Sequence, residues 1–226
     1  MKSITITALA MSDDPSRNMA YFEQILRNGY IEIESFYSQE LFSELARIAL
    51  STDFDNQKSC SPGGDLRNLA LNVTLVNLLR DLASLKLNYF RDEQMSQAFS
   101  GETHMHIAKK GSAHIERSRL YMDYHFDCSC VNAVLPLKLP DRLTEPPTGL
   151  HMYKNQRTTS RLGVRARLLR YLINKYPWSP LLKLLYPPAF IQYQINSLYI
   201  FFGDLSLHGV EPVSKGERVT MFISYE

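Results

Sequence analysis

The sequence is poor in cysteine and has no long apolar run. Three cysteines among 226 residues are too few for a disulfide framework, which excludes the small disulfide-rich secreted domains. No hydrophobic stretch approaches the roughly 20 residues that a membrane-spanning helix needs. Internal repeats and Gly- or Ser-rich linkers are also absent. These absences favour one soluble domain covering residues 1–226, which we expect to be cytoplasmic.

A second absence is local, because no Asp or Glu occurs between Glu145 and Asp204. Charge segregated in this way usually indicates an anionic partner or surface. We interpret residues 155–189 as a basic helical insertion within the domain, with a helix from 160 to 176. The acid-free stretch contains eight basic residues: Lys154, Arg157, Arg161, Arg165, Arg167, Arg170, Lys175 and Lys183.

Arg161 and Arg165 fall on the apolar stripe of that predicted helix, whereas Arg167 and Arg170 fall opposite it. Three interpretations stay open. The arginine stems could lie along apolar surface with their charged ends in water. The segment could instead form a lid in which Arg161 and Arg165 bind an anionic substrate. It could also dock on an anionic membrane, helped by Trp178 and the sequence LLKLLY.

The chain also contains a histidine–carboxylate pattern with the composition of a metal site. His125 and Asp127 form a His-x-Asp pair, His208 is an isolated histidine far downstream, and Arg218 follows it. Two histidines and one carboxylate are the ligand set that holds non-haem Fe(II) and leaves coordination positions open. We therefore predict an iron site formed by His125, Asp127 and His208.

Strand alternation supports this interpretation. In the segment 119–127 the odd positions Arg119, Tyr121, His125 and Asp127 share one face of a predicted strand. In ERVTMFISY, Arg218 and Thr220 likewise share a face. Two such polar faces could line the interior of a small barrel or jelly roll. An ordinary antiparallel sheet with one solvent-exposed face is the alternative.

The arginine suggests the kind of co-substrate. A bidentate 2-oxo acid could occupy two of the open iron positions and dioxygen the third. A five-carbon 2-oxo diacid leaves a second carboxylate some distance from the metal, and a buried carboxylate needs a partner. The planar guanidinium of Arg218 can donate two parallel hydrogen bonds to it, with the Thr220 hydroxyl on the same face.

At these residues the sequence resembles the Fe(II)/2-oxoglutarate-dependent oxygenases, and its layout is closest to the phytanoyl-CoA-hydroxylase-like members. The resemblance implies a mainly β fold: a double-stranded β-helix (jelly-roll or cupin-like) core with N-terminal helices packed on one face. It also implies a dioxygenase that uses Fe(II), 2-oxoglutarate and dioxygen. Hydroxylation is the outcome expected, because related halogenases replace the carboxylate that is present here as Asp127.

The expected substrate is a small or lipid-like organic molecule with an aliphatic carbon to hydroxylate and possible negative charge. Arg119 and Tyr121 join Arg161 and Arg165 as candidate substrate contacts. One alternative is a non-enzymatic protein that binds an anionic ligand on the same barrel; another is a nucleic-acid- or protein-modifying oxygenase. Nucleic-acid demethylases carry a second arginine at the position of Ser224, and the net charge is only +2. No obligate protein partner is expected, and peripheral membrane contact stays an alternative.

Periodicity predicts helices at about 16–28, 38–51 and 66–85. Strands are predicted at 30–36, 86–91, 103–109, 114–128, 131–137, 148–154, 190–202, 205–210 and 217–225. The pair His104 and His106 is a rival metal site, but no acidic or histidine partner is evident, so these residues are interpreted as polar strand positions. Cys128 and Cys130 are expected to pack in the core.

Overall fold

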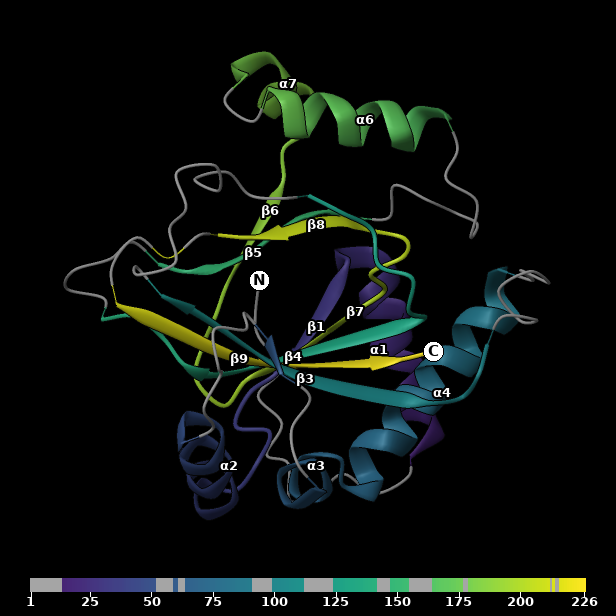
Figure 1. Cartoon of the computed structure of the whole chain (residues 1–226). Coiled ribbons are helices and arrows are strands. Elements are labelled where there is room, and N and C mark those ends of the chain that lie inside the picture. Colours follow the sequence, from purple (N-terminus) through teal and green to yellow (C-terminus); the bar gives the residue numbers. More distant parts are fainter. Residues whose placement is uncertain are drawn as a thin grey trace.

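The computed structural model is mainly antiparallel sheet with helices packed on it, as predicted (Figure 1). It describes residues 14–51, 59–60, 64–90, 99–111, 124–141, 147–154, 164–176, 179–211, 213 and 216–226. Within these residues, no helix is both long and apolar enough to cross a membrane.

Two antiparallel sheets face one another. The larger has the order β1-β7-β4-β9-β3-β2 and the smaller the order β6-β5-β8. The strands of the larger sheet are β1 (Tyr30–Ile33), β2 (Ser59–Cys60), β3 (Thr103–Gly111), β4 (Val131–Lys138), β7 (Leu198–Phe201) and β9 (Glu217–Tyr225). Those of the smaller sheet are β5 (Gly149–Tyr153), β6 (Ala189–Gln192) and β8 (Leu207–Val210).

Four helices cover the outer face of the larger sheet: α1 (Pro15–Asn28), α2 (Gln39–Ser51), α3 (Gly64–Ala70) and α4 (Val73–Phe90). Alternate residues of β9, such as Val219, Met221 and Ile223, point into this core and are fully buried. The opposite face of β9 carries Arg218 and Thr220, as predicted, and points toward the smaller sheet. Because both faces of the sheet are covered, its strands are apolar along most of their length.

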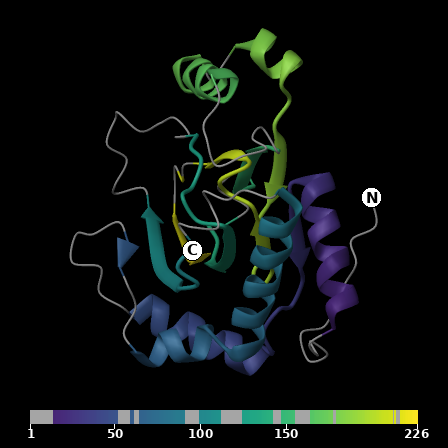
Figure 2. The same ribbon diagram turned by 90° about the vertical axis from the view of Figure 1, so that its right-hand side faces the viewer.

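Two further helices, α6 (Val164–Lys175) and α7 (Pro180–Leu185), lie beyond the smaller sheet, at the end of the molecule opposite α2 and α3 (Figures 1 and 2). They fall within the predicted insertion. A small cluster joins α6 to the sheets: Leu169 and Ile173 pack with Tyr124, Tyr153 and Leu207.

Several local boundaries differ from those predicted. The single helix expected at 66–85 is two helices, because the Asn72 side chain caps the backbone N–H of Leu75 and starts α4 anew. The strand expected at 86–91 is wrong, since α4 continues to Phe90. The strand expected at 190–202 is divided into β6 and β7 by a turn in which Asn196 has φ of 60°.

Candidate metal and co-substrate site

The segment around His125 runs beside the chain that leads to His208. His125 donates its backbone N–H to the His208 carbonyl at 2.9 Å, and the His208 N–H returns to the His125 carbonyl at 3.0 Å. The N–H of Asp127 bonds to the Gly203 carbonyl at 3.0 Å. His125 and Asp127 are two residues apart in this extended segment, so both side chains face His208.

The three predicted ligands form one cluster whose ligand atoms all lie within 4.8 Å of one another. His208 Nε2 lies 3.1 Å from Asp127 Oδ2, and His125 Nε2 lies 3.4 Å from Asp127 Oδ1. Adjacent ligands on one octahedral ion, with bonds of about 2.1 Å, would be about 3 Å apart. The spacing of each histidine from Asp127 therefore fits neighbouring positions on a single metal ion.

The cluster is open on one side. The His208 side chain is 3% exposed and that of Asp127 16%, whereas that of His125 is 43% exposed. Burial raises the pKa of Asp127, but hydrogen bonds from His125 and His208 outweigh this effect and hold the pKa well below its usual range. Asp127 is therefore an ionised carboxylate at neutral pH, the form that binds a cation.

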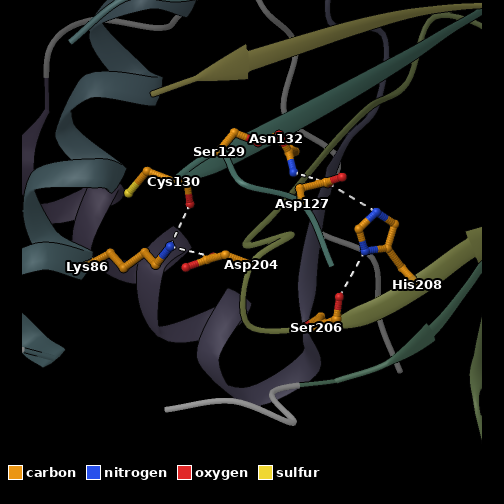
Figure 3. A network of polar contacts seen from close by, with 8 residues as sticks. All are labelled: Lys86, Asp127, Ser129, Cys130, Asn132, Asp204, Ser206 and His208. Carbon is orange, nitrogen blue, oxygen red and sulfur yellow. Dashed lines mark hydrogen bonds and ion pairs between the residues drawn. The ribbon is translucent and has the colours of Figure 1, made fainter. Parts of the chain in front are cut away.

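Buried polar groups fix the orientation of two ligands (Figure 3). His208 Nδ1 lies 2.9 Å from the carbonyl of Ser206, which can only accept, so Nδ1 carries a proton. The other nitrogen, Nε2, faces Asp127 and is the atom that would bind a metal in place of its hydrogen bond to the carboxylate. The amide of Asn132 donates to Asp127 Oδ2, and Ser129 donates to the amide oxygen of Asn132. Sequence reasoning missed Asn132; its one signal is an amide in the apolar run VNAVLPL.

A buried ion pair supports the same two segments from the helix side. The ammonium of Lys86, on α4, lies 2.5 Å from Asp204 Oδ1 and donates to the Cys130 carbonyl at 2.8 Å (Figure 3). Both side chains are almost fully buried. Lys86 thus ties together the residues that follow Asp127 and the turn that precedes His208.

Gly203 allows these segments to approach closely. A Cβ at this position would overlap the Asn132 amide and the Asp127 carboxylate. Any larger residue would therefore displace a predicted ligand.

Arg218, on β9, is a second buried cation. It is 5% exposed, and its Nη1 donates to Thr148 Oγ1 and to the Glu211 carbonyl, both at 2.7 Å. Among the described residues, no carboxylate lies within ion-pair distance of it. Burial lowers the pKa of Arg218, while Tyr193 and Glu211 act in the opposite direction.

The hydroxyl of Tyr193 is a second buried donor near Arg218. It has no hydrogen-bond partner in the described part of the chain, and it interacts electrostatically with Arg218. Burial raises its pKa to about 12, so it is a neutral donor. A carboxylate between Arg218 and Tyr193 would satisfy both groups. The donor set therefore fits a second co-substrate carboxylate, and nothing in the sequence distinguishes Tyr193 from the other tyrosines.

Not all of the predicted site residues can be placed. Arg119, Tyr121 and Arg161 lie outside the described residues, and Arg165 lies on α6 with its side chain outside them. Thr220 is half-buried, two residues after Arg218 on the same face of β9.

The other histidine and cysteine predictions have mixed outcomes. His104 lies at the surface near Glu102 and Glu226. His106 points into the interior, with its ring against Phe222. Among the described residues, neither histidine belongs to a metal-binding cluster. Cys130 is buried as expected. Cys128 is exposed, because the chain bends after Asp127 and strand alternation ends there.

Comparisons with known proteins support the fold. No protein-family model matches the sequence, and no curated protein is similar to it. Solved structures do match. AviO1 from Streptomyces viridochromogenes has a TM-score of 0.58 and 13% identity, covering 92% of this chain and 94% of that one.

The names of two further matches state the activity of the matched protein. A Trichoplax adhaerens prolyl hydroxylase, in complex with a hypoxia-inducible-factor peptide, has a TM-score of 0.56 and 13% identity over 93% of this chain and 89% of its own. The non-haem 2-oxoglutarate-dependent epimerase SnoN, from nogalamycin biosynthesis, also has a TM-score of 0.56, with 12% identity over 94% and 84%. The chain therefore has the double-stranded β-helix fold of the Fe(II)/2-oxoglutarate-dependent oxygenases, as its metal and arginine motifs predicted.

Proposed function

We propose that the protein is an Fe(II)- and 2-oxoglutarate-dependent dioxygenase that hydroxylates an aliphatic carbon of a small or lipid-like, anionic organic substrate. The observation that carries the proposal is the joint presence of two sites inside one fold. One is the His125–Asp127–His208 cluster, which is open on the His125 side. The other is Arg218, buried without a carboxylate partner among the described residues.

Each residue has a defined part in this proposal. His125, Asp127 and His208 would hold Fe(II), while Arg218, with Thr220, would hold the distal carboxylate of 2-oxoglutarate. Bound iron and 2-oxoglutarate would supply dioxygen activation coupled to oxidative decarboxylation of the co-substrate. The protein's own contribution is to keep Asp127 ionised, to keep His208 in the correct tautomer and to orient the carboxylates.

The first prediction separates metal from co-substrate binding. His208→Ala should abolish stoichiometric Fe(II) binding and 2-oxoglutarate turnover. Arg218→Met should leave metal binding intact but weaken 2-oxoglutarate binding by more than about a hundredfold, because a buried charge pair is worth about 3–5 kcal/mol. Arg218→Lys should restore part of the loss, since it keeps the charge but not the planar fork. Anaerobic calorimetric titration with Mn(II) and then 2-oxoglutarate measures each step.

A matched control is Arg47→Met, which removes an exposed arginine paired with Glu44 on α2. It should bind metal and 2-oxoglutarate like the wild type. Full iron occupancy and turnover in His208→Ala would refute the metal assignment. Unchanged 2-oxoglutarate affinity in Arg218→Met would assign the arginine to strand packing and favour the alternative of a non-enzymatic binding protein.

The second prediction concerns substrate charge. Arg161 and Arg165 belong to the acid-free stretch, and α6 is attached beside His125 through the hydrogen bonds of Asn174 to Tyr124. Reversing both charges to Glu should raise the KM for an anionic substrate, and added salt should mimic the effect on the wild type. Decarboxylation of 2-oxoglutarate without substrate should persist, because the metal ligands and Arg218 are untouched. Arg80→Glu, on the exposed face of α4, is the control.

A further inference from the structure

Helix α6 has apolar residues on two opposite sides. Ala166, Leu169 and Ile173 are 4%, 7% and 2% exposed, and the last two pack against the strand region. Val164, Leu168 and Tyr171 follow at helical spacing on the other side and are 79%, 54% and 55% exposed. A helix anchored on one side ordinarily presents polar residues on the other, so the outer stripe calls for an explanation.

Helix α7 also exposes apolar side chains. Leu181, Leu184 and Leu185 are 62%, 77% and 61% exposed. In both views α7 lies next to α6 at the same end of the molecule (Figures 1 and 2). We refer to the exposed apolar residues of these two neighbouring helices together as the outer apolar face: Val164, Leu168, Tyr171, Leu181, Leu184 and Leu185.

Basic residues border the outer apolar face. Arg167, Arg170 and Lys175 line a hollow of about 510 Å³ together with Tyr171 and Asn174. The ammonium of Lys175 donates to the Tyr171 hydroxyl at 2.7 Å and lies over the Tyr171 ring. No acidic residue occurs between Glu145 and Asp204, so every formal charge that this stretch itself contributes is positive. Helices that lie in a lipid headgroup region typically combine exposed leucines and tyrosines with Lys and Arg at their border.

We propose that α6 and α7 dock the protein on the surface of an anionic lipid bilayer through the outer apolar face. The positive charge beside the outer apolar face favours an anionic bilayer over a second copy of this chain. A second copy of this chain would bring two basic surfaces together, whereas anionic headgroups would neutralise them. A nucleic acid would neutralise the charge too, but it offers no apolar phase for the four exposed leucines of the outer apolar face.

Docking would hold the predicted metal site near the bilayer. The Asn174 side chain pairs with both backbone groups of Tyr124: it accepts from the N–H at 3.0 Å and donates to the carbonyl at 2.9 Å. Tyr124 is the residue before His125, and Leu207, before His208, packs in the same cluster as Leu169. A lipid-like substrate could then be taken from the membrane. This last consequence rests on the proposed function, whereas docking itself does not.

Vesicle co-sedimentation tests the proposal without iron or 2-oxoglutarate. The wild type should sediment with vesicles of phosphatidylcholine and phosphatidylserine, much less with phosphatidylcholine alone, and less at high salt. Arg167→Gln/Arg170→Gln should weaken binding by about 25-fold, because each cation near an anionic surface contributes about fivefold. Leu184→Ser/Leu185→Ser should also lose binding. Circular dichroism and Mn(II) titration of each variant verify that the fold and the metal site remain.

Two control variants carry matched changes elsewhere: Val73→Ser, an exposed apolar residue at the start of α4, and Arg47→Gln on α2. Both should bind vesicles like the wild type. The proposal is overturned if the wild type does not sediment with anionic vesicles, or if the α6 and α7 variants bind as well as the controls. It is also overturned if light scattering shows a dimer that Leu184→Ser/Leu185→Ser dissociates, because the outer apolar face would then belong to a second copy.

Discussion

The side-chain amide of Asn132 fixes the orientation of the Asp127 carboxylate. Asn132 is fully buried on β4 and donates to Asp127 Oδ2, while Ser129 holds the amide in that orientation. Replacing Asn132 by Leu keeps the branching at Cγ but removes the donor, so the carboxylate can rotate away from its place beside His125 and His208. Loss of such an outer contact typically lowers metal affinity by about 10–100-fold. Competitive titration with Mn(II) or Co(II) measures the change.

Asn72→Ala is the control for this prediction, because it removes an asparagine whose side chain caps α4 far from the metal cluster. It should lower the melting temperature and leave metal affinity unchanged. Equal metal affinity in Asn132→Leu and wild type would show that backbone pairing alone orients Asp127.

Residue type explains what sequence reasoning could and could not find at this scale. His125, Asp127, His208 and Arg218 could be selected as candidates because few residue types ligate iron or pair with a carboxylate, and the structure brings the first three together. Asn132 was not, because its role arises from the pairing of β4 with its neighbours rather than from its own chemistry. The orphan hydroxyl of Tyr193 likewise becomes visible only when its surroundings are known.

At the scale of elements, α4 is coupled to the metal segments by Lys86. Lys86→Met leaves Asp204 buried without its cation, and the expected loss is about 3–5 kcal/mol in the free energy of unfolding. Metal affinity should fall as well, because the ammonium joins the Cys130 carbonyl to the turn before His208. The double variant Lys86→Met/Asp204→Leu should recover part of the stability, since no buried charge remains unpaired, but not the metal affinity. Thermal unfolding and Mn(II) titration distinguish the two effects.

Asp81→Asn supplies the comparison on the same helix. Its carboxylate accepts from the Asn18 side chain at 2.7 Å, between α4 and α1 and away from the metal cluster. This variant should lose stability without losing metal affinity. If Lys86→Met behaved in the same way, the ion pair would serve packing alone.

Element boundaries were the weaker part of the sequence-based prediction. The helices α1 and α2 and strands β3, β4 and β9 appear where periodicity placed them. The segment from Lys86 to Phe90 was mistaken for a strand because a buried lysine interrupts the helical apolar pattern. Only its distant partner Asp204 explains why a lysine is buried there. The division of α6 into an inner and an outer apolar side was also invisible, because hydropathy does not indicate which side packs.

At the scale of the whole molecule, several buried tyrosines should make the folded state less stable at alkaline pH. Burial raises the pKa of Tyr37, Tyr124 and Tyr199 well above the usual value, and that of Tyr193 to about 12. The folded protein therefore favours the protonated phenols. Their contribution to stability is complete below about pH 10, the ordinary tyrosine pKa, and is lost as pH rises through the raised values.

We expect alkaline unfolding to begin above about pH 10, with delayed tyrosinate absorbance from the buried members of the 13 tyrosines. Tyr193→Phe should reduce the delayed absorbance step, because it removes a phenol whose pKa burial raises to about 12. Circular dichroism recorded in parallel locates unfolding. Complete ionisation of all tyrosines near pH 10, with the fold intact, would contradict the prediction.

The reciprocal backbone bonds between His125 and His208 also constrain the order of events during synthesis. Strands β4, β5, β6 and β7 all lie between these residues in the chain, so the bridge closes a long loop and its entropic cost is offset only once the two sheets have paired. A nascent chain that has not yet released β8 has one histidine and one carboxylate and no third ligand. The predicted metal site can therefore form only after β8 has left the ribosome, and its three side chains come together only once the two sheets have paired.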